Sequence, residues 1–439
     1  MRRRLLPAVL LQLLLAVSTA HGQGSTDVTL GTTKGGIRIR IHCEWLEPKG
    51  DKSARAMSVT AEEVMADDLE NSAVFSLTRA WVPGQQPFDI QATVGGQWTV
   101  SGNQVKLTGE VRDVPARRPI LVREYRGQLS EWRALVHRFA DDVVLQFTGE
   151  AGVSQTRIAF ISGQGKAKEL YVMDLDGARA RPLTADQSLA LSPSWSPEGS
   201  LLLFTSYRGG SGPQVFVMAS EGGKPYLISG RPGLNTTPSY SPDGREIVCT
   251  LSQDGNPEIY VLDARGGSPR RITNSRSIDT SPCWSPTGRE IAFTSDRAGS
   301  PQVYVMDREG GNVRRLNYDV EYTDSPAWSP RGDRIAFVAR TGAGFDIYVC
   351  RADGSGPRLV VGGGSNENPR WSPDGRHLVF ASNRDSVPGL YVTDLDDRPV
   401  RRLDTGGMRA QSPAWSPRPP NSGSAVNLNL EDAKRGGTR

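Results

Sequence analysis

Residues 281–288 read Ser-Pro-Cys-Trp-Ser-Pro-Thr-Gly, and this short phrase decides the fold. Five relatives of the phrase occur elsewhere in the 439-residue chain, each with an aromatic residue just before Ser-Pro. The six aromatic residues are Trp195, Tyr240, Trp284, Trp328, Trp371 and Trp415. Their spacings of 45, 44, 44, 43 and 44 residues are regular enough to predict a repeat architecture.

Each period contains four short β-rich segments separated by turn residues. In the third period they cover residues 279–284, 290–294, 302–306 and 314–316. Pro-Asp-Gly at 242–244 and 373–375 favours a β-turn, because Pro fixes φ and Gly accepts positive φ. Four strands in a period of this length are typical of a β-propeller blade, and blades stack around an axis to bury their apolar faces.

The two ends of the repeat array complete each other. Residues 157–184 supply the second, third and fourth strands of a blade, whereas residues 411–417 supply a Trp strand with nothing after it. We therefore predict a six-bladed propeller over 156–417, closed by pairing the C-terminal strand with the N-terminal blade strands. Closure would remove the open sheet edges that invite aggregation. The repeated Trp is expected to pack between blades.

A small N-terminal α+β domain, an α/β sandwich, is predicted over residues 23–150. The alternation of apolar and polar residues from Ile37 to Trp45 indicates a half-buried strand. Thr60 and Glu63 fit a capping box at the start of a helix. The remaining expected elements are the end of that helix near Ser72, strands at 97–101, 105–111 and 120–125, and a second helix from Ser130 that Gly149 closes.

Both termini have compositions unlike the rest of the chain. Arg2-Arg3-Arg4 precede an apolar run of thirteen residues, too short at about 1.5 Å each to cross a hydrocarbon core of about 30 Å. A signal peptide over 1–22, cleaved after Ala20 or Gly22, is the prediction. Its loss would reduce the net charge from +4 to about +1, so nucleic-acid binding and stable membrane insertion are not expected. Residues 418–439 are predicted to be a disordered tail.

The sequence carries no recognisable catalytic or metal-binding motif. It lacks the Gly-x-Ser-x-Gly elbow and the complete Gly-rich phosphate-binding motifs, so neither a serine peptidase of the propeller-plus-hydrolase type nor a nucleotide-binding site of these types is expected. Its cysteines form no metal-ligand spacing and are expected to be free thiols, although disulfide pairing stays open. They are Cys43, Cys249, Cys283 and Cys350.

The loops that enter the innermost strands are the candidate binding surface. They are polar and differ from blade to blade, as partner-binding loops do. The candidate residues are Asn235, Thr236, Thr237, Asp279, Thr280, Thr323, Asp324, Asn366, Glu367 and Gln411. No cofactor is expected, but acidic oxygens at a channel mouth also suit Ca²⁺. Two alternatives therefore remain: an exported hydrolase or lactonase with a metal in the axial channel, and a generic ligand-binding propeller.

Several longer stretches resemble the TolB family of the bacterial Tol–Pal system. They are Phe-Thr-Ser-Asp-Arg-Ala-Gly-Ser-Pro-Gln-Val-Tyr at 293–304, Phe-Thr-Gly-Glu-Ala-Gly-Val-Ser-Gln-Thr-Arg-Ile-Ala-Phe at 147–160, Ala-Asp-Asp-Leu-Glu-Asn-Ser at 66–72, and the final Ser-Pro-Ala-Trp-Ser-Pro. The resemblance covers nearly the whole chain after the signal peptide. In it, Thr237 and Thr280 match positions that face the lipoprotein Pal.

The resemblance implies a periplasmic, non-enzymatic protein. Such a protein binds Pal with one face of its propeller and communicates with TolA and other inner-membrane Tol proteins through its N-terminal region. That system maintains outer-membrane integrity and draws the membrane inward at cell division. The segment Gly24–Gly36, which corresponds to the family's TolA-binding segment, is Gly/Thr-rich here and departs from the family pattern.

Overall fold

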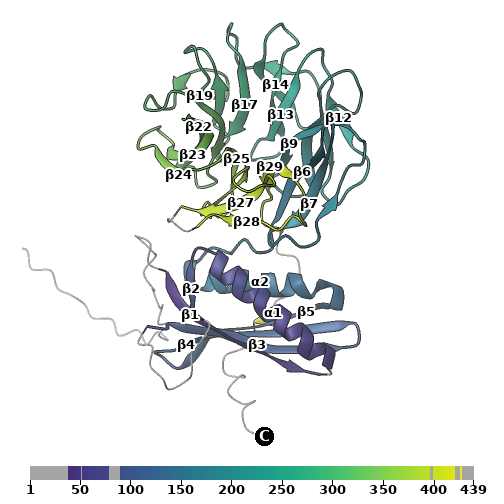
Figure 1. Ribbon diagram of the computed structural model, residues 1–439, viewed down its shortest axis with the longest axis vertical. Helices are drawn as coiled ribbons and strands as arrows, with labels where there is room; N and C mark the ends of the chain where they lie inside the picture. The colour runs from purple at the N-terminus through teal and green to yellow at the C-terminus, as the bar shows by residue number, and fades with distance from the viewer. Residues whose placement is uncertain are drawn as a thin grey trace, which may run out of the picture.

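The computed structural model describes residues 38–50, 52–78, 89–342, 344–395, 399–420 and 426–427. Figure 1 shows an α/β domain below a β-propeller, the two fold units that the sequence predicts. The predicted signal peptide and its cleavage sites lie outside the described residues. Among the helices described, none combines the length and the apolar character needed to cross a membrane.

The N-terminal domain is a six-stranded sheet with two helices on one face. Its strand order is β2-β1-β3-β4-β5-β30, with β1 parallel to β2 and β3 and the later pairs antiparallel. In chain order the elements are β1 (Ile39–Lys49), α1 (Lys52–Asn71), β2 (Phe75–Thr78), β3 (Ala92–Ser101), β4 (Gln104–Asp113), β5 (Arg118–Gln128), a 3-10 turn (Leu129–Glu131) and α2 (Trp132–Thr148), joined much later by β30 (Val426–Asn427).

The apolar faces of the helices and the sheet form a single core in this domain. Met65 of α1 and Phe139 of α2 are fully buried against Trp98 and Leu107 of the sheet. The ring of Phe139 lies so close to Gly109 of β4 that a Cβ there would approach the ring to 2.4 Å. Both helices lie on the propeller side of the sheet in Figure 1, and α2 contributes Arg133 and His137 to the contacts between the two domains.

The structure of this domain differs from the sequence prediction in two places. Helix α1 begins at Lys52, so Thr60 and Glu63 lie inside it and do not cap its start. The short strand β2, which pairs with β1, had no prediction. The second helix is confirmed: α2 ends at Gly149, which adopts the left-handed conformation with φ of 76°.

The propeller consists of six four-stranded sheets. The first three blades are β9 (Ala190–Trp195), β10 (Leu201–Ser206), β11 (Gln214–Ala219) and β12 (Tyr226–Ser229); β13 (Asn235–Tyr240), β14 (Glu246–Leu251), β15 (Glu258–Asp263) and β16 (Arg270–Arg271); β17 (Asp279–Trp284), β18 (Glu290–Ser295), β19 (Gln302–Asp307) and β20 (Arg314–Arg315). The last three are β21 (Thr323–Trp328), β22 (Arg334–Thr341), β23 (Gly344–Arg351) and β24 (Arg358–Val361); β25 (Asn366–Trp371), β26 (His377–Ser382), β27 (Gly389–Asp394) and β28 (Arg401–Arg402); β29 (Ala410–Trp415), β6 (Arg157–Gln164), β7 (Ala167–Asp174) and β8 (Arg181–Pro182).

The sixth blade joins the two ends of the array, as the incomplete repeats predict. Strand β29 pairs antiparallel with β6, with Trp415 opposite Ile158. Each innermost strand also contacts the innermost strands of both neighbouring blades, and β29 contacts β9, so the ring is continuous.

The repeated aromatic residues pack between blades, as predicted. Trp195 lies in a core cluster with residues of the sixth blade, and its indole Nε1 donates to the Ala414 carbonyl at 3.0 Å. Trp371 does the same toward the fourth blade, donating to the Ala327 carbonyl at 2.9 Å. The repeated Trp therefore contributes to the packing between blades.

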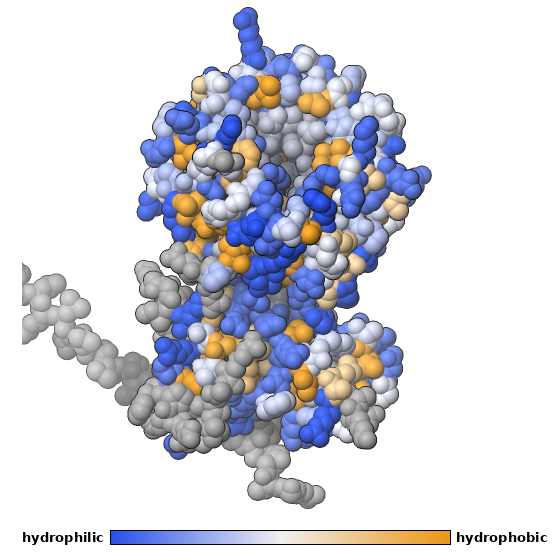
Figure 2. Space-filling view, viewed as in Figure 1, coloured by the Kyte–Doolittle hydropathy of each residue, from blue (hydrophilic) through white to orange (hydrophobic). Residues whose placement is uncertain are grey.

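The two domains meet through buried and half-buried charges, and Figure 2 shows strongly hydrophilic residues where they join. His137 of α2 places Nδ1 2.6 Å from Asp68 of α1 and Nε2 3.3 Å from Asp176 of the propeller. Burial alone would lower the pKa of His137, but the two carboxylates outweigh it and raise the pKa to about 10. Arg133 also contacts Asp176, at 2.6 Å. His137 is therefore a buried cation that links the domains.

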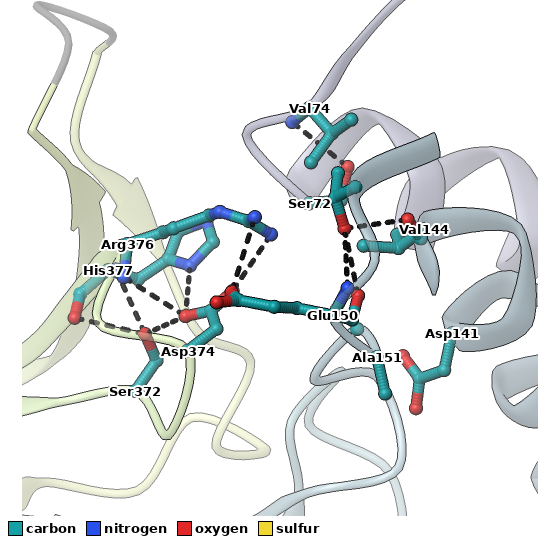
Figure 3. A network of polar contacts seen from close by, with 12 residues as sticks. Ser72, Val74, Asp141, Val144, Glu150, Ala151, Ser372, Asp374, Arg376 and His377 are labelled. Atoms are coloured by element: carbon teal, nitrogen blue, oxygen red, sulfur yellow. Dashed lines mark hydrogen bonds and ion pairs between the residues drawn. The ribbon is translucent and has the colours of Figure 1, made fainter. Parts of the chain in front are cut away.

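The linker between the domains is held from both sides. Figure 3 shows Glu150 of the linker directed at Arg376 on the propeller, and the same carboxylate pairs with Arg331 at 2.7 Å. Arg418, just after the last blade, donates to the linker carbonyl of Ala151 at 2.6 Å. Two tail residues, β30, pair with β5. At these places the chain beyond Pro417 contacts the rest of the molecule, unlike a wholly disordered tail; residues 421–425 and 428–439 lie outside the described part.

Candidate functional site

The channel of the propeller has two chemically different ends. Glu150 of the linker pairs with Arg331 and Arg376 in the turns that follow two of the innermost strands, and we name this the proximal end. The innermost strands begin at the opposite, distal end, where the chain supplies all ten sequence-predicted site residues. The loops that connect the second and third strands of each blade lie at that end too. The distal end is therefore the candidate partner-binding surface.

A backbone feature repeated in every blade shapes the innermost strands. In all six innermost strands, the residue before the first proline of the repeated phrase has a positive φ between 48° and 54°. The pairing register with the second strand of the blade shifts at the same place. Such a β-bulge bends the strand and redirects side chains. Thr237 is one of these residues, and its Oγ1 lies 2.9 Å from Oγ1 of Thr250 within the same blade.

Four of the ten predicted residues are buried rather than exposed at the mouth. Asn235, Asp279, Thr323 and Asn366 are the first residues of their strands, and each is at most 1% exposed. The prediction that their side chains form the binding surface therefore needs correction. Each is instead hydrogen-bonded or ion-paired to neighbouring groups of the propeller. Asn235, for example, donates to the Arg231 carbonyl at 2.8 Å and accepts from the Ser229 hydroxyl at 2.7 Å.

Asp279 and Asn366 hold equivalent arginines in the third and fifth blades. Arg297 pairs with Asp279 at 3.0 Å, and Arg384 donates to the side-chain oxygen of Asn366 at 2.9 Å. Each guanidinium also lies over a tyrosine ring of its own blade. Burial raises the pKa of Asp279, although Arg297 opposes that shift. These contacts fix the rim of the mouth and leave no free charge at the first strand position.

The second strand positions are accessible. Thr236, Thr280, Asp324 and Gln411 are half-buried and Glu367 is exposed, so five of the predicted residues still face the mouth. They have few partners: Asp324 accepts from the Thr294 hydroxyl at 2.7 Å, and Gln411 accepts from Lys168 at 3.1 Å. Contact of these side chains with a partner stays a prediction.

The candidate site residues predicted from the sequence did not include the apolar residues at the same rim. Leu234 and Ile278 immediately precede two innermost strands and are 38% and 50% exposed, and Tyr322 occupies the same position in the fourth blade. The equivalent residues of the fifth and sixth blades are Ser365 and Arg409. One part of the mouth is therefore apolar and the other polar. The sequence contained this signal, a large apolar residue before four consecutive innermost strands, the first of them Leu189 before β9, but the exposure of these residues could not be predicted from it.

The polar part of the mouth contains a hollow of about 360 Å³ between the fifth and sixth blades. Its lining includes Lys168, Arg409 and Gln411, which give it a positive character. Inside the ring, nearer the proximal end, a second cavity of about 440 Å³ occupies the axis and is lined by the Ser, Pro and Trp residues of the repeated phrase. Figure 2 shows the propeller hollowed at its centre.

The described residues of the distal mouth provide surfaces for binding. Within the described ranges, no three side chains of His, Cys, Asp or Glu gather closely enough to hold a metal ion. Of the three acids that the sequence suggested for Ca²⁺, Asp279 is already paired with Arg297. All four cysteines are free thiols, as expected.

Comparisons with known proteins agree with this geometry. A family described as "TolB beta propeller domain" matches residues 144–419. The structure of TolB from Acinetobacter baumannii is 26% identical, covers 87% of this chain and 97% of that one, and superposes with a TM-score of 0.78.

Two curated relatives match shorter stretches of this chain. The Tol-Pal system protein TolB of Syntrophotalea carbinolica is 38% identical over 207 residues, which is 43% of this chain and 47% of that protein. The TolB homolog of Chlorobium chlorochromatii is 41% identical over 115 residues, 26% of each chain. The aligned stretches thus span about half or less of these relatives' length. The matched domain covers more than half of this chain, and the chain belongs to the TolB family.

Proposed function

We propose that this protein is a periplasmic component of a Tol–Pal envelope system and acts as a docking protein rather than an enzyme. In this proposal the distal mouth binds the peptidoglycan-associated lipoprotein Pal. The N-terminal domain communicates with TolA and other inner-membrane Tol proteins. The complex maintains outer-membrane integrity and constriction at division. The names of the relatives, which place them in the Tol-Pal system, support the proposal.

The observation that carries the proposal is the composition of the distal mouth. Leu234 and Ile278 expose large apolar side chains beside half-buried polar residues, at the end of the channel away from the N-terminal domain. Protein interfaces concentrate their binding energy in such apolar anchors surrounded by a polar rim. Thr236, Thr280, Asp324, Glu367 and Gln411 would form that rim.

A binding measurement with the soluble domain of the cognate Pal tests the proposal. Ile278→Asp places a charge in the apolar part of the mouth, and we expect affinity to fall at least tenfold, about 1.4 kcal/mol. Glu367→Lys should change the affinity less, because its side chain is exposed. Surface plasmon resonance would give both values.

A matched control exists on the outer edge of the first blade. Leu227 in β12 is 54% exposed, close to the value for Ile278. It lies on the outermost strand of its blade, at the opposite edge of the sheet from the channel. We expect Leu227→Asp to bind Pal within twofold of the unmodified protein. If Ile278→Asp and Leu227→Asp bound Pal with equal affinity, the distal mouth would not be the binding surface.

A further inference from the structure

One side chain breaks the uniform chemistry of the axial cavity. Each innermost strand contributes to the cavity wall the residue just before its aromatic residue, and the six are Ser194, Ser239, Cys283, Ala327, Arg370 and Ala414. Five of them are small and uncharged, and the sixth is Arg370. Of all the described residues that line this cavity of about 440 Å³, Arg370 alone carries a charge.

Arg370 has no acidic counter-ion in the described part of the chain. The one contact of its guanidinium that the structure records is to the backbone carbonyl of the preceding residue, Pro369, which accepts from Nη1 at 3.0 Å. Burial lowers the pKa of Arg370, and the ionisable group that faces it electrostatically is Cys283, two blades away around the ring. Burial raises the pKa of the Cys283 thiol to about 11, so that thiol is neutral at pH 7 and does not balance the arginine.

The arginines of the distal rim show how differently this chain treats other guanidinium groups. Arg297 is paired with Asp279, and Arg384 is held by Asn366 and a tyrosine ring. A guanidinium withdrawn from bulk water without an anion is unfavourable, and its planar fork matches the two oxygens of a carboxylate or phosphate. Hydroxyl groups of Ser281 and Ser325, among others on the cavity wall, could donate further hydrogen bonds to such an anion.

We propose that the axial channel is an anion-binding site in which Arg370 holds a small free oxyanion, either a carboxylate or a phosphate. The cavity volume lies within the range of small-molecule sites. Arg370 lies four residues along its strand from Asn366, about 13 Å from the distal end at roughly 3.3 Å per residue. The site is therefore separate from the proposed Pal surface and does not depend on it.

Calorimetric titration of the full chain with inorganic phosphate, and in a separate arm with succinate, tests this proposal. We expect saturable one-to-one binding in at least one arm, and the tighter arm identifies phosphate or carboxylate as the preferred group. The variant Arg370→Ser introduces the residue that the first two blades have at the equivalent position, so we expect it to fold. We expect this variant to bind at least tenfold more weakly.

Arg289→Ser is the matched control, because Arg289 is exposed in the turn after β17 at the same end of the channel. Its affinity should stay within twofold of the unmodified protein. The bound anion should also raise the melting temperature of the unmodified protein but not that of Arg370→Ser. If Arg370→Ser does not fold, Arg370→Gln takes its place in both measurements. Equal affinity in the Arg370 variant and the unmodified protein, or no saturable binding in either arm, would overturn the proposal.

Discussion

The two ends of the propeller channel differ in how they use repeated and unrepeated residues. At the proximal end every blade supplies nearly the same Ser-Pro-x-Trp-Ser-Pro phrase, whose residues line the axial cavity and whose Trp packs between blades. At the distal end the blades supply different residues, but difference alone does not mark a binding surface. Asn235, Asp279 and Thr323 differ from one another and are all buried, because each is bonded to neighbouring groups of the propeller itself. Accessibility, rather than variation, separates docking residues from structural ones.

The most damaging test of this comparison removes the strand that closes the ring. Deleting residues 411–439 takes away Trp415, which packs with Val379 and Leu390 of the neighbouring blade. Loss of one buried Trp costs about 3–5 kcal/mol, a large share of a typical total of about 5–15 kcal/mol. We expect the truncated chain to lose its cooperative thermal transition and to aggregate, as light scattering would show.

Truncation after Pro420 is the control for that deletion. It retains β29 and removes β30, which contributes two residue pairs to the edge of the N-terminal sheet. We expect a cooperative transition close to that of the full chain. If the chain without residues 411–439 melted cooperatively as a soluble monomer, closure of the ring would not be needed for the stability of the propeller.

A second test acts on the charges that attach the N-terminal domain to the proximal end. His137→Gln leaves Asp68 and Asp176 without the cation between them, and removal of one partner from a buried ion pair costs about 3–5 kcal/mol. Denaturant unfolding would measure the loss. Adding Asp68→Asn removes one of the stranded charges, so the double variant should recover part of the stability. An additive loss in the double variant would mean that the two groups do not interact.

The same histidine predicts a pH dependence. Its pKa in the folded protein, about 10, exceeds the ordinary value of 6.5, so the stabilisation is fully present below pH 6.5. That stabilisation is lost as pH rises through about 10. The melting temperature of the unmodified protein should therefore fall more between pH 7 and pH 10 than that of His137→Gln. Parallel curves for the two proteins would contradict the prediction.

The smallest expected effect concerns the repeated aromatic residues themselves. Trp371→Phe removes the Nε1 hydrogen bond to Ala327 and should cost about 1 kcal/mol. Trp284 is equally buried, but its Nε1 has no hydrogen-bond partner among the described residues. Trp284→Phe should accordingly change stability by less than half as much. Equal losses in urea unfolding would show that the indole hydrogen bonds between blades contribute little beyond packing.

The errors in the sequence analysis have a common physical origin. The Thr60–Glu63 pattern matches a capping box, yet both residues lie within α1, because such a pattern can occur at any point of a helix that packing extends. Likewise the polar residues at the start of the innermost strands look like a binding surface in sequence. Their burial depends on which neighbouring loops and strands pack against them, and no local pattern predicts this.

Sequence alone determined the number of blades and the pairing of the two chain segments in the sixth blade. A fixed period and two complementary incomplete repeats are properties of the linear chain, and a closed sheet is the way to bury their apolar faces. The tertiary structure decided which charges meet. Arg38 reaches Asp394 across 356 positions of sequence, and His137 finds one carboxylate in each domain. Such contacts depend on the relative placement of folded units, because side chains interact over a few ångströms of space whatever their separation along the chain.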